Sequence, residues 1–80
     1  MNIEEQNILN SDGGMKIMFK NNLKYYRKCK GMTQIQLAKK AGITNDYISQ
    51  IERGIKNPGL LMAKKISNIL EQNIDEVFFI

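Results

Sequence analysis

The fold of this 80-residue chain is decided within residues 32–54, which read MTQIQLAKKAGITNDYISQIERG. Thr33 is followed three residues later by Gln36, the spacing of a capping box, in which each side chain accepts a hydrogen bond from the other residue's backbone amide. The pattern therefore predicts a helix that begins at Gln34. Gly42 is expected to end this helix, because glycine readily adopts the left-handed conformation of a helix C-terminus.

A second short helix is predicted directly after this glycine. Thr44 is a typical N-cap residue, and the spacing of Ile48 and Ile51 places two apolar side chains on one helical face. In the first helix, Ala38 and Ala41 are small enough to let the two helices approach closely at a steep angle. The sequence thus predicts two short helices joined by a tight glycine turn.

This helix pair resembles the Cro/C1-type helix-turn-helix domains, also called the lambda-repressor-like or XRE family, over residues 23–78. The positions that carry the resemblance are Gln34, Ala38, Gly42, Ile43, Ile48 and Ile51, followed by Glu52-Arg53-Gly54 and Asn57-Pro58. The resemblance implies a compact five-helix, all-α DNA-binding domain.

The rest of the chain agrees with this fold class, because no strand pattern interrupts it. We expect a flexible N-terminal tail over residues 1–16 and the helix-turn-helix domain over residues 17–80. Further helices are predicted over about 19–29 and 60–70, with a short fifth helix after a capping box at Asn73. Their apolar positions are Phe19, Leu23, Tyr26, Ala63, Ile66, Ile69, Leu70, Ile74, Val77 and Phe78.

Length and composition exclude several classes of protein. Eighty residues make one small domain, without room for a separate ligand-sensing or catalytic module. The acidic start and the absence of a long apolar run argue against a secretory signal or a membrane span, so we expect a cytoplasmic protein. A single cysteine and no histidine disfavour a disulfide, a metal site and an enzyme. We expect no cofactor and no small-molecule ligand.

Charge is distributed unevenly along the chain. Residues 1–14 contain Glu4, Glu5 and Asp12 without a basic residue, whereas residues 15–80 contain all twelve lysines and arginines against five acids. The basic part suits a polyanionic partner. The alternative is an ordinary lysine-rich, solvated surface.

Polar residues of the second motif helix are the candidates for reading bases. By position in the family motif these are Asn45, Asp46, Ser49 and Gln50, since Asn and Gln can pair with adenine and Asp can accept a hydrogen bond from cytosine. Each could instead be an ordinary solvent-facing residue. Asp46 in particular could simply favour the positive end of the helix dipole.

A second group is expected to contact phosphates around this helix. The resemblance and the residue chemistry assign this role to Gln34, Thr44, Tyr47, Arg53, Lys56, Asn57 and, more weakly, Lys40. Tyr47 could alternatively pack against the preceding helix. Arg27 and Glu52 are expected to form a structural ion pair instead, because the corresponding pair joins the first and third helices in the family.

The C-terminal residues Val77, Phe78, Phe79 and Ile80 carry more apolar surface than a small monomer easily covers. Related domains often associate through their last helix, so we expect a homodimer on a palindromic operator. In the alternative, Phe78 completes the core and the last two residues fray.

The leading interpretation is a sequence-specific regulator of transcription that binds double-stranded DNA and represses by blocking a promoter. Its composition is typical of an AT-rich bacterial genome. The alternative is a protein-interaction module, or an antitoxin-like partner of another protein, that keeps the fold. An enzyme is disfavoured, because no nucleophile, base and orienting group can be assembled.

Overall fold

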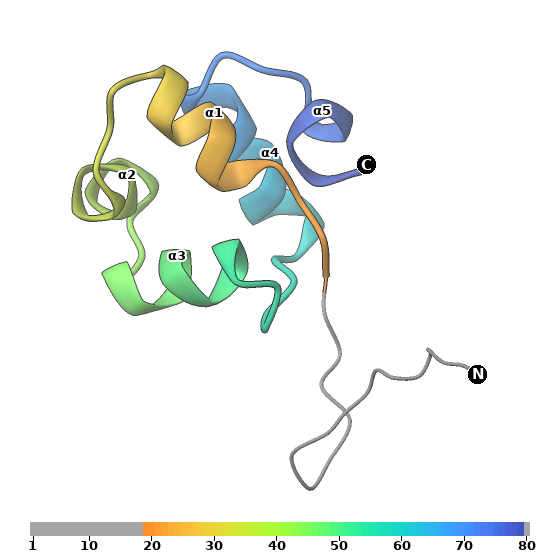
Figure 1. The fold of residues 1–80 in the computed structure, drawn as a ribbon, viewed down its shortest axis with the longest axis horizontal. Coiled ribbons are helices and arrows are strands. Elements are labelled where there is room, and N and C mark those ends of the chain that lie inside the picture. The colour runs from red at the N-terminus through yellow and green to blue at the C-terminus, as the bar shows by residue number, and fades with distance from the viewer. Residues whose placement is uncertain (1–18, 80) are drawn as a thin grey trace, which may run out of the picture.

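The structure, a computed structural model, describes residues 19–79 and consists of five short helices over that range (Figure 1). The helices are α1 (Leu23–Cys29), α2 (Gln34–Ala41), α3 (Asn45–Glu52), α4 (Leu60–Ile69) and α5 (Ile74–Phe78). The all-α, five-helix prediction is confirmed. The tail predicted over residues 1–16 lies outside the described residues. Within residues 19–79, no helix is long and apolar enough to cross a membrane.

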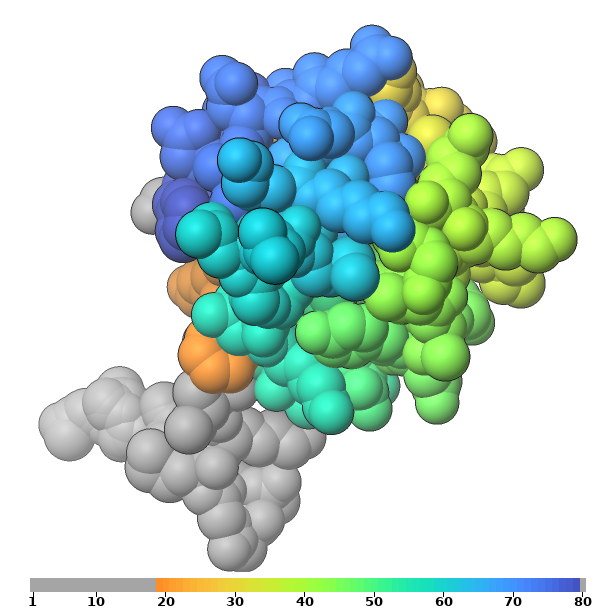
Figure 2. Space-filling model, turned by 180° about the vertical axis from the view of Figure 1, so that it is seen from behind, coloured from red at the N-terminus to blue at the C-terminus, as the bar shows by residue number. Residues whose placement is uncertain are grey.

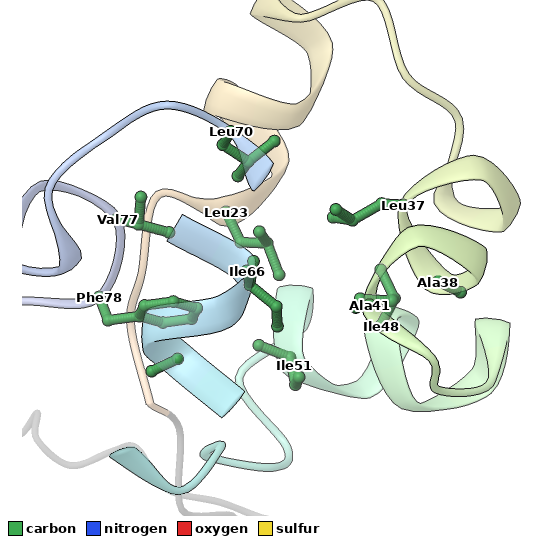
Figure 3. Close-up of a cluster of buried hydrophobic side chains, with 11 residues drawn as sticks. Leu23, Leu37, Ala38, Ala41, Ile48, Ile51, Ile66, Leu70, Val77 and Phe78 are labelled. Carbon is green, nitrogen blue, oxygen red and sulfur yellow. The ribbon is translucent and has the colours of Figure 1, made fainter. Parts of the chain in front are cut away.

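The helices surround one apolar core, to which all five contribute (Figure 3). α2 packs against α3 and α4, α4 packs against α5, and α1 contacts both α3 and α5. Burial of large apolar side chains in this centre supplies most of the driving force for folding. The buried apolar side chains are Leu23, Leu37, Ala38, Ala41, Ile48, Ile51, Ala63, Ile66, Leu70, Val77 and Phe78.

The caps of α2 and α3 form as the sequence predicts. The Thr33 hydroxyl accepts a hydrogen bond from the Gln36 amide at 3.0 Å, and Gln36 Oε1 accepts one from the Thr33 amide at 2.8 Å. Gly42 ends α2 with φ 74°, in the left-handed region. The Thr44 hydroxyl then accepts a hydrogen bond from the Tyr47 amide at 3.0 Å, so only three residues, 42–44, separate α2 from α3.

The first helix begins later than predicted. It starts at Leu23 rather than near Phe19, because the Asn21 side-chain oxygen accepts a hydrogen bond from the Leu23 amide at 2.9 Å. Asparagine competes in this way with the backbone and favours a helix start over a helix interior. Phe19 therefore lies outside α1, half-buried in the segment that leads into it.

This lead-in segment joins two distant parts of the fold. The Phe19 amide donates to the Gly54 carbonyl at 2.8 Å, and the Asn21 side-chain amide donates to the Ile51 carbonyl at 2.8 Å. On the other side, the Asn22 amide donates to the Val77 carbonyl at 2.7 Å. Residues 19–22 thus connect the C-terminal end of α3 to the C-terminal end of α5.

The end of α5 differs from the predicted dimer surface. Val77 is 0% exposed and Phe78 is also buried, so both side chains belong to the core of the single chain. The prediction that these two residues contact a partner is therefore wrong. α5 has only five residues, and its buried apolar side chains pack against α4 and α1. Phe79 is 64% exposed, and Ile80 lies outside the described residues.

Candidate nucleic-acid interface

The outer face of α3 is polar because its two apolar side chains point inward. Ile48 and Ile51 are fully buried, which fixes the rotation of the helix about its axis. At 3.6 residues per turn, Asp46, Ser49 and Gln50 then lie on the side away from the core. Asp46 is exposed, and Ser49 and Gln50 are partly exposed.

Asn45, the remaining candidate for base readout, lies at the first position of α3 and is exposed. It borders an open cleft of about 460 Å³ that is lined mainly by the end of α1, the loop between α1 and α2, and the start of α2. Gln34 and Ile35 of α2 line the same cleft. Asn45 is thus set apart from the other three candidates, toward the first motif helix.

The C-terminal end of α3 is held by a buried ion pair. Arg27 Nε donates to Glu52 Oε2 at 2.5 Å and Arg27 Nη2 donates to Glu52 Oε1 at 3.1 Å, while Nη1 donates to the Met32 carbonyl at 2.7 Å. The two side chains are only 8% and 3% exposed. Such a forked, two-bond contact fixes the orientation of both groups, so the pair joins α1 to α3.

Gln34 contacts the same carboxylate. Its Nε2 donates to Glu52 Oε1 at 3.0 Å, which orients the Gln34 side chain at the start of α2. Sequence reasoning did not predict this hydrogen bond. One proton of the Gln34 amide group is used in it. Gln34 lies at the N-terminus of α2, where the positive end of the helix dipole favours anions.

A turn after α3 presents the second predicted group of phosphate contacts. Gly54 has φ 77°, and the Gln50 carbonyl accepts hydrogen bonds from the amides of Ile55 at 2.9 Å and Lys56 at 3.2 Å. The left-handed glycine therefore reverses the chain directly after the helix. Arg53 and Lys56 lie on the two sides of this glycine, and both are exposed, as is the following Asn57.

The remaining predicted phosphate contacts differ in position. The Thr44 hydroxyl caps α3, and Tyr47 is half-buried against the core at the start of the same helix. Lys40 is exposed in the last turn of α2. It lies six residues after Gln34, and a rise of about 1.5 Å per residue separates the two by roughly 9 Å along the helix axis. Lys40 is therefore remote from the Gln34–Glu52 contact.

Comparison with known proteins agrees with this arrangement. A family model described as helix-turn-helix matches residues 23–77. The chain belongs to this Cro/C1-type helix-turn-helix family. The match covers α1 to α4 and nearly all of α5, so the family assignment made from the sequence is confirmed.

Individual relatives in the family come from archaea and bacteria. An uncharacterized HTH-type transcriptional regulator of Methanocaldococcus jannaschii, MJ0272, is 42% identical over 59 residues, which are 74% of this chain and 89% of the relative. The regulator SinR of Bacillus subtilis is 38% identical over 58 residues, 71% of this chain. The aligned part spans only 52% of SinR, about half its length.

Solved structures of the family share the fold. SinR in complex with DNA has a TM-score of 0.63 and 39% identity, covering 66% of this chain and 86% of that one. The restriction-modification controller C.AhdI of Aeromonas hydrophila has a TM-score of 0.67 and 32% identity, covering 71% and 83%. These values support the same helical arrangement in all three chains.

Two features of this family member were not foreseen from its sequence. One is the sharing of the Glu52 carboxylate between Arg27 and Gln34; the other is the lead-in segment at residues 19–22. The pair Asn21-Asn22 just before an apolar residue was a usable signal for a helix start, since asparagine is a strong capping residue.

Elsewhere on α1, a hydrogen bond with the Cys29 thiol raises the pKa of the exposed Tyr25 hydroxyl above its ordinary value.

Proposed function

We propose that this chain regulates transcription by sequence-specific binding of double-stranded DNA, with α3 in the major groove. The observation that carries the proposal is the polar face of α3 with anchoring groups at its borders. A helix of this size fits the major groove, where each base pair has its own pattern of donors and acceptors. In SinR, the same fold has been solved in complex with DNA.

In this proposal, base edges are read by Asn45, Asp46, Ser49 and Gln50. The buried Ile48 and Ile51 hold α3 against the core, so that the readout side chains are presented by a rigid element. Each well-paired contact would contribute about 1–3 kcal/mol of discrimination between bases.

Phosphate contacts on either side would set the register of the helix on the duplex. Gln34 would act at the start of α2, where the hydrogen bond to Glu52 already orients its amide group. Arg53, Lys56 and Asn57 would act on the turn after α3. Thr44, Tyr47 and Lys40 complete the proposed set.

The regulator is proposed to act as a homodimer that represses by covering a promoter. Phe79, 64% exposed, supports an association through the end of the chain. At the N-terminus of α4, Leu60 and Leu61 are 66% and 83% exposed and add apolar surface. α5 lies beside α4 in the fold (Figure 1). Two-fold symmetry would then require two half-sites about one helical turn of DNA apart.

The test is selection of bound duplexes from a random DNA library by the purified protein at about 150 mM salt, where non-specific electrostatic binding is weak. The proposal predicts enrichment of an inverted repeat. Enrichment of a single half-site would retain the DNA-binding function and remove the dimer. Failure to enrich any sequence would overturn the proposal and favour a module that binds another protein.

A further inference from the structure

The chain enters the domain beside the proposed phosphate contacts. The Phe19 amide is hydrogen-bonded to the Gly54 carbonyl at 2.8 Å, and Gly54 lies between Arg53 and Lys56 in the turn after α3. The Asn21 side chain adds a bond of 2.8 Å to the Ile51 carbonyl. Seen from behind, the described start of the chain (orange) lies against the segment that follows α3 (blue-green) (Figure 2).

The segment that precedes this anchor is opposite in charge to the turn beside it. Residues 1–18 contain Glu4, Glu5 and Asp12 and one base, Lys16. Arg53 and Lys56 are exposed, and neither forms an ion pair with another residue of the described range 19–79. The described chain thus begins at Phe19 beside a basic turn, and the sequence that precedes Phe19 is acidic.

The length of chain is sufficient for contact. Asp12 lies seven residues before Phe19, and seven residues span at most about 25 Å. The eight residues of α3 are only about 12 Å long, so the carboxylate can reach Arg53, Lys56 and the rest of the α3 surface. Attachment to the domain raises the effective concentration of such a group to the order of millimolar.

We propose that the acidic N-terminal segment, residues 1–14, competes with DNA for the basic turn formed by Arg53 and Lys56. The inference rests on the proposed function, because it requires that this turn contacts phosphates. Carboxylates at the turn would have to be displaced by DNA, which lowers the affinity for every duplex by a similar factor. Base contacts are untouched, so the segment weakens non-specific and specific binding alike and shortens residence at random sites.

The test compares the full chain with a variant carrying Glu4→Gln, Glu5→Gln and Asp12→Asn, which removes three charges and keeps side-chain size. Binding of a labelled random-sequence duplex is measured by fluorescence anisotropy between 50 and 200 mM salt. We expect the variant to bind about 3- to 10-fold more tightly at the lowest salt, with a slope of log K against log salt that is steeper by about one to two units.

A charge-matched control separates this effect from a change in net charge. The double variant Glu4→Gln with Glu5→Gln is compared with Glu71→Gln with Asp75→Asn, which removes two charges beyond α4. The first pair should tighten binding and the second should not. An equal increase in both pairs would assign the effect to net charge and overturn the inference, as would unchanged affinity and slope in the triple variant.

A second readout requires no DNA. In two-dimensional amide NMR spectra of the free proteins, the triple variant should shift the resonances of residues 53–57 and leave those of α4 in place. Unchanged resonances of residues 53–57 would also overturn the inference. If neither the full chain nor the variant binds any duplex, the proposed function itself fails, and the competition with DNA fails with it.

Discussion

Gln34, the first residue of α2, donates a hydrogen bond of 3.0 Å to Glu52, the last residue of α3. The two helices of the motif are therefore joined at their outer ends as well as through the glycine turn. Because the same carboxylate also accepts two hydrogen bonds from Arg27, one buried side chain sets the positions of α1, α2 and α3. The α2 N-terminus and the end of α3 are consequently held in a fixed relation.

Removal of one partner from this network should destabilise the fold. Arg27→Ala leaves the Glu52 carboxylate buried without its cation, and breaking such a pair on one side lowers the free energy of unfolding by about 3–5 kcal/mol. Urea unfolding followed by circular dichroism measures the loss. Arg53→Ala is the control, because this exposed arginine should change stability by less than about 0.5 kcal/mol. Equal midpoints for both variants would contradict a structural role for Arg27.

If α3 reads base edges, a substitution on its outer face should change the preferred DNA sequence and leave the fold intact. Gln50→Ala should relax selection at one position of the half-site and reduce discrimination there by about 1–3 kcal/mol. Competition binding with all four bases at each operator position measures this effect. Asn68→Ala, on the exposed face of α4, should leave the preference intact. An unaltered preference in Gln50→Ala would remove this residue from the readout set.

A phosphate contact should show itself in the salt dependence instead. Lys56→Ala should weaken binding to operator and random duplexes by a similar factor and reduce the slope of log K against log salt by about one unit. Lys64→Ala removes an equal charge from an exposed position of α4 and should leave the slope unchanged. A slope that falls equally in both variants would point to net charge alone.

The glycine turn between α2 and α3 allows the role of backbone conformation to be tested. Gly42 has φ 74°, and a Cβ there would meet only Lys65 Nζ at 3.6 Å, so space does not oppose a side chain. Gly42→Ala should nevertheless lower stability by about 1–2 kcal/mol, because L-residues, unlike the achiral glycine, disfavour the left-handed region. Gly42→Asn should lose less, since asparagine tolerates this conformation. Thermal unfolding of the two variants side by side tests this order of stability. Equal losses of stability in both variants would contradict a role for the left-handed conformation at residue 42.

Two neighbouring phenylalanines allow the core and the proposed dimer surface to be tested separately, because Phe78 is buried and Phe79 is exposed. Phe79→Ser should shift sedimentation equilibrium toward the monomer without lowering stability of the monomer, because Phe79 is largely exposed. Phe78→Ala should instead lower the free energy of unfolding by about 3–5 kcal/mol, the usual loss for a buried phenylalanine. A fully dimeric Phe79→Ser protein would show that the surface lies elsewhere.

The sequence by itself determined the local structure of the motif. The caps at Thr33 and Thr44, the glycine that ends α2 and the inward spacing of Ile48 and Ile51 could be predicted, because each depends on residues within one or two helical turns. The family resemblance follows from the same positions. The polar outer face of α3 is a further consequence, since fixing the apolar side of a short helix fixes its other side.

Only the tertiary structure decided the features that join distant residues. The start of α1 depends on Asn21, whose side-chain amide also reaches the Ile51 carbonyl, and the burial of Val77 depends on how much of α4 remains to be covered. The convergence of Arg27 and Gln34 on Glu52 is likewise invisible in local patterns. Helical periodicity tells which face of an element is apolar, but the elements that cover this face are chosen by packing of the whole chain.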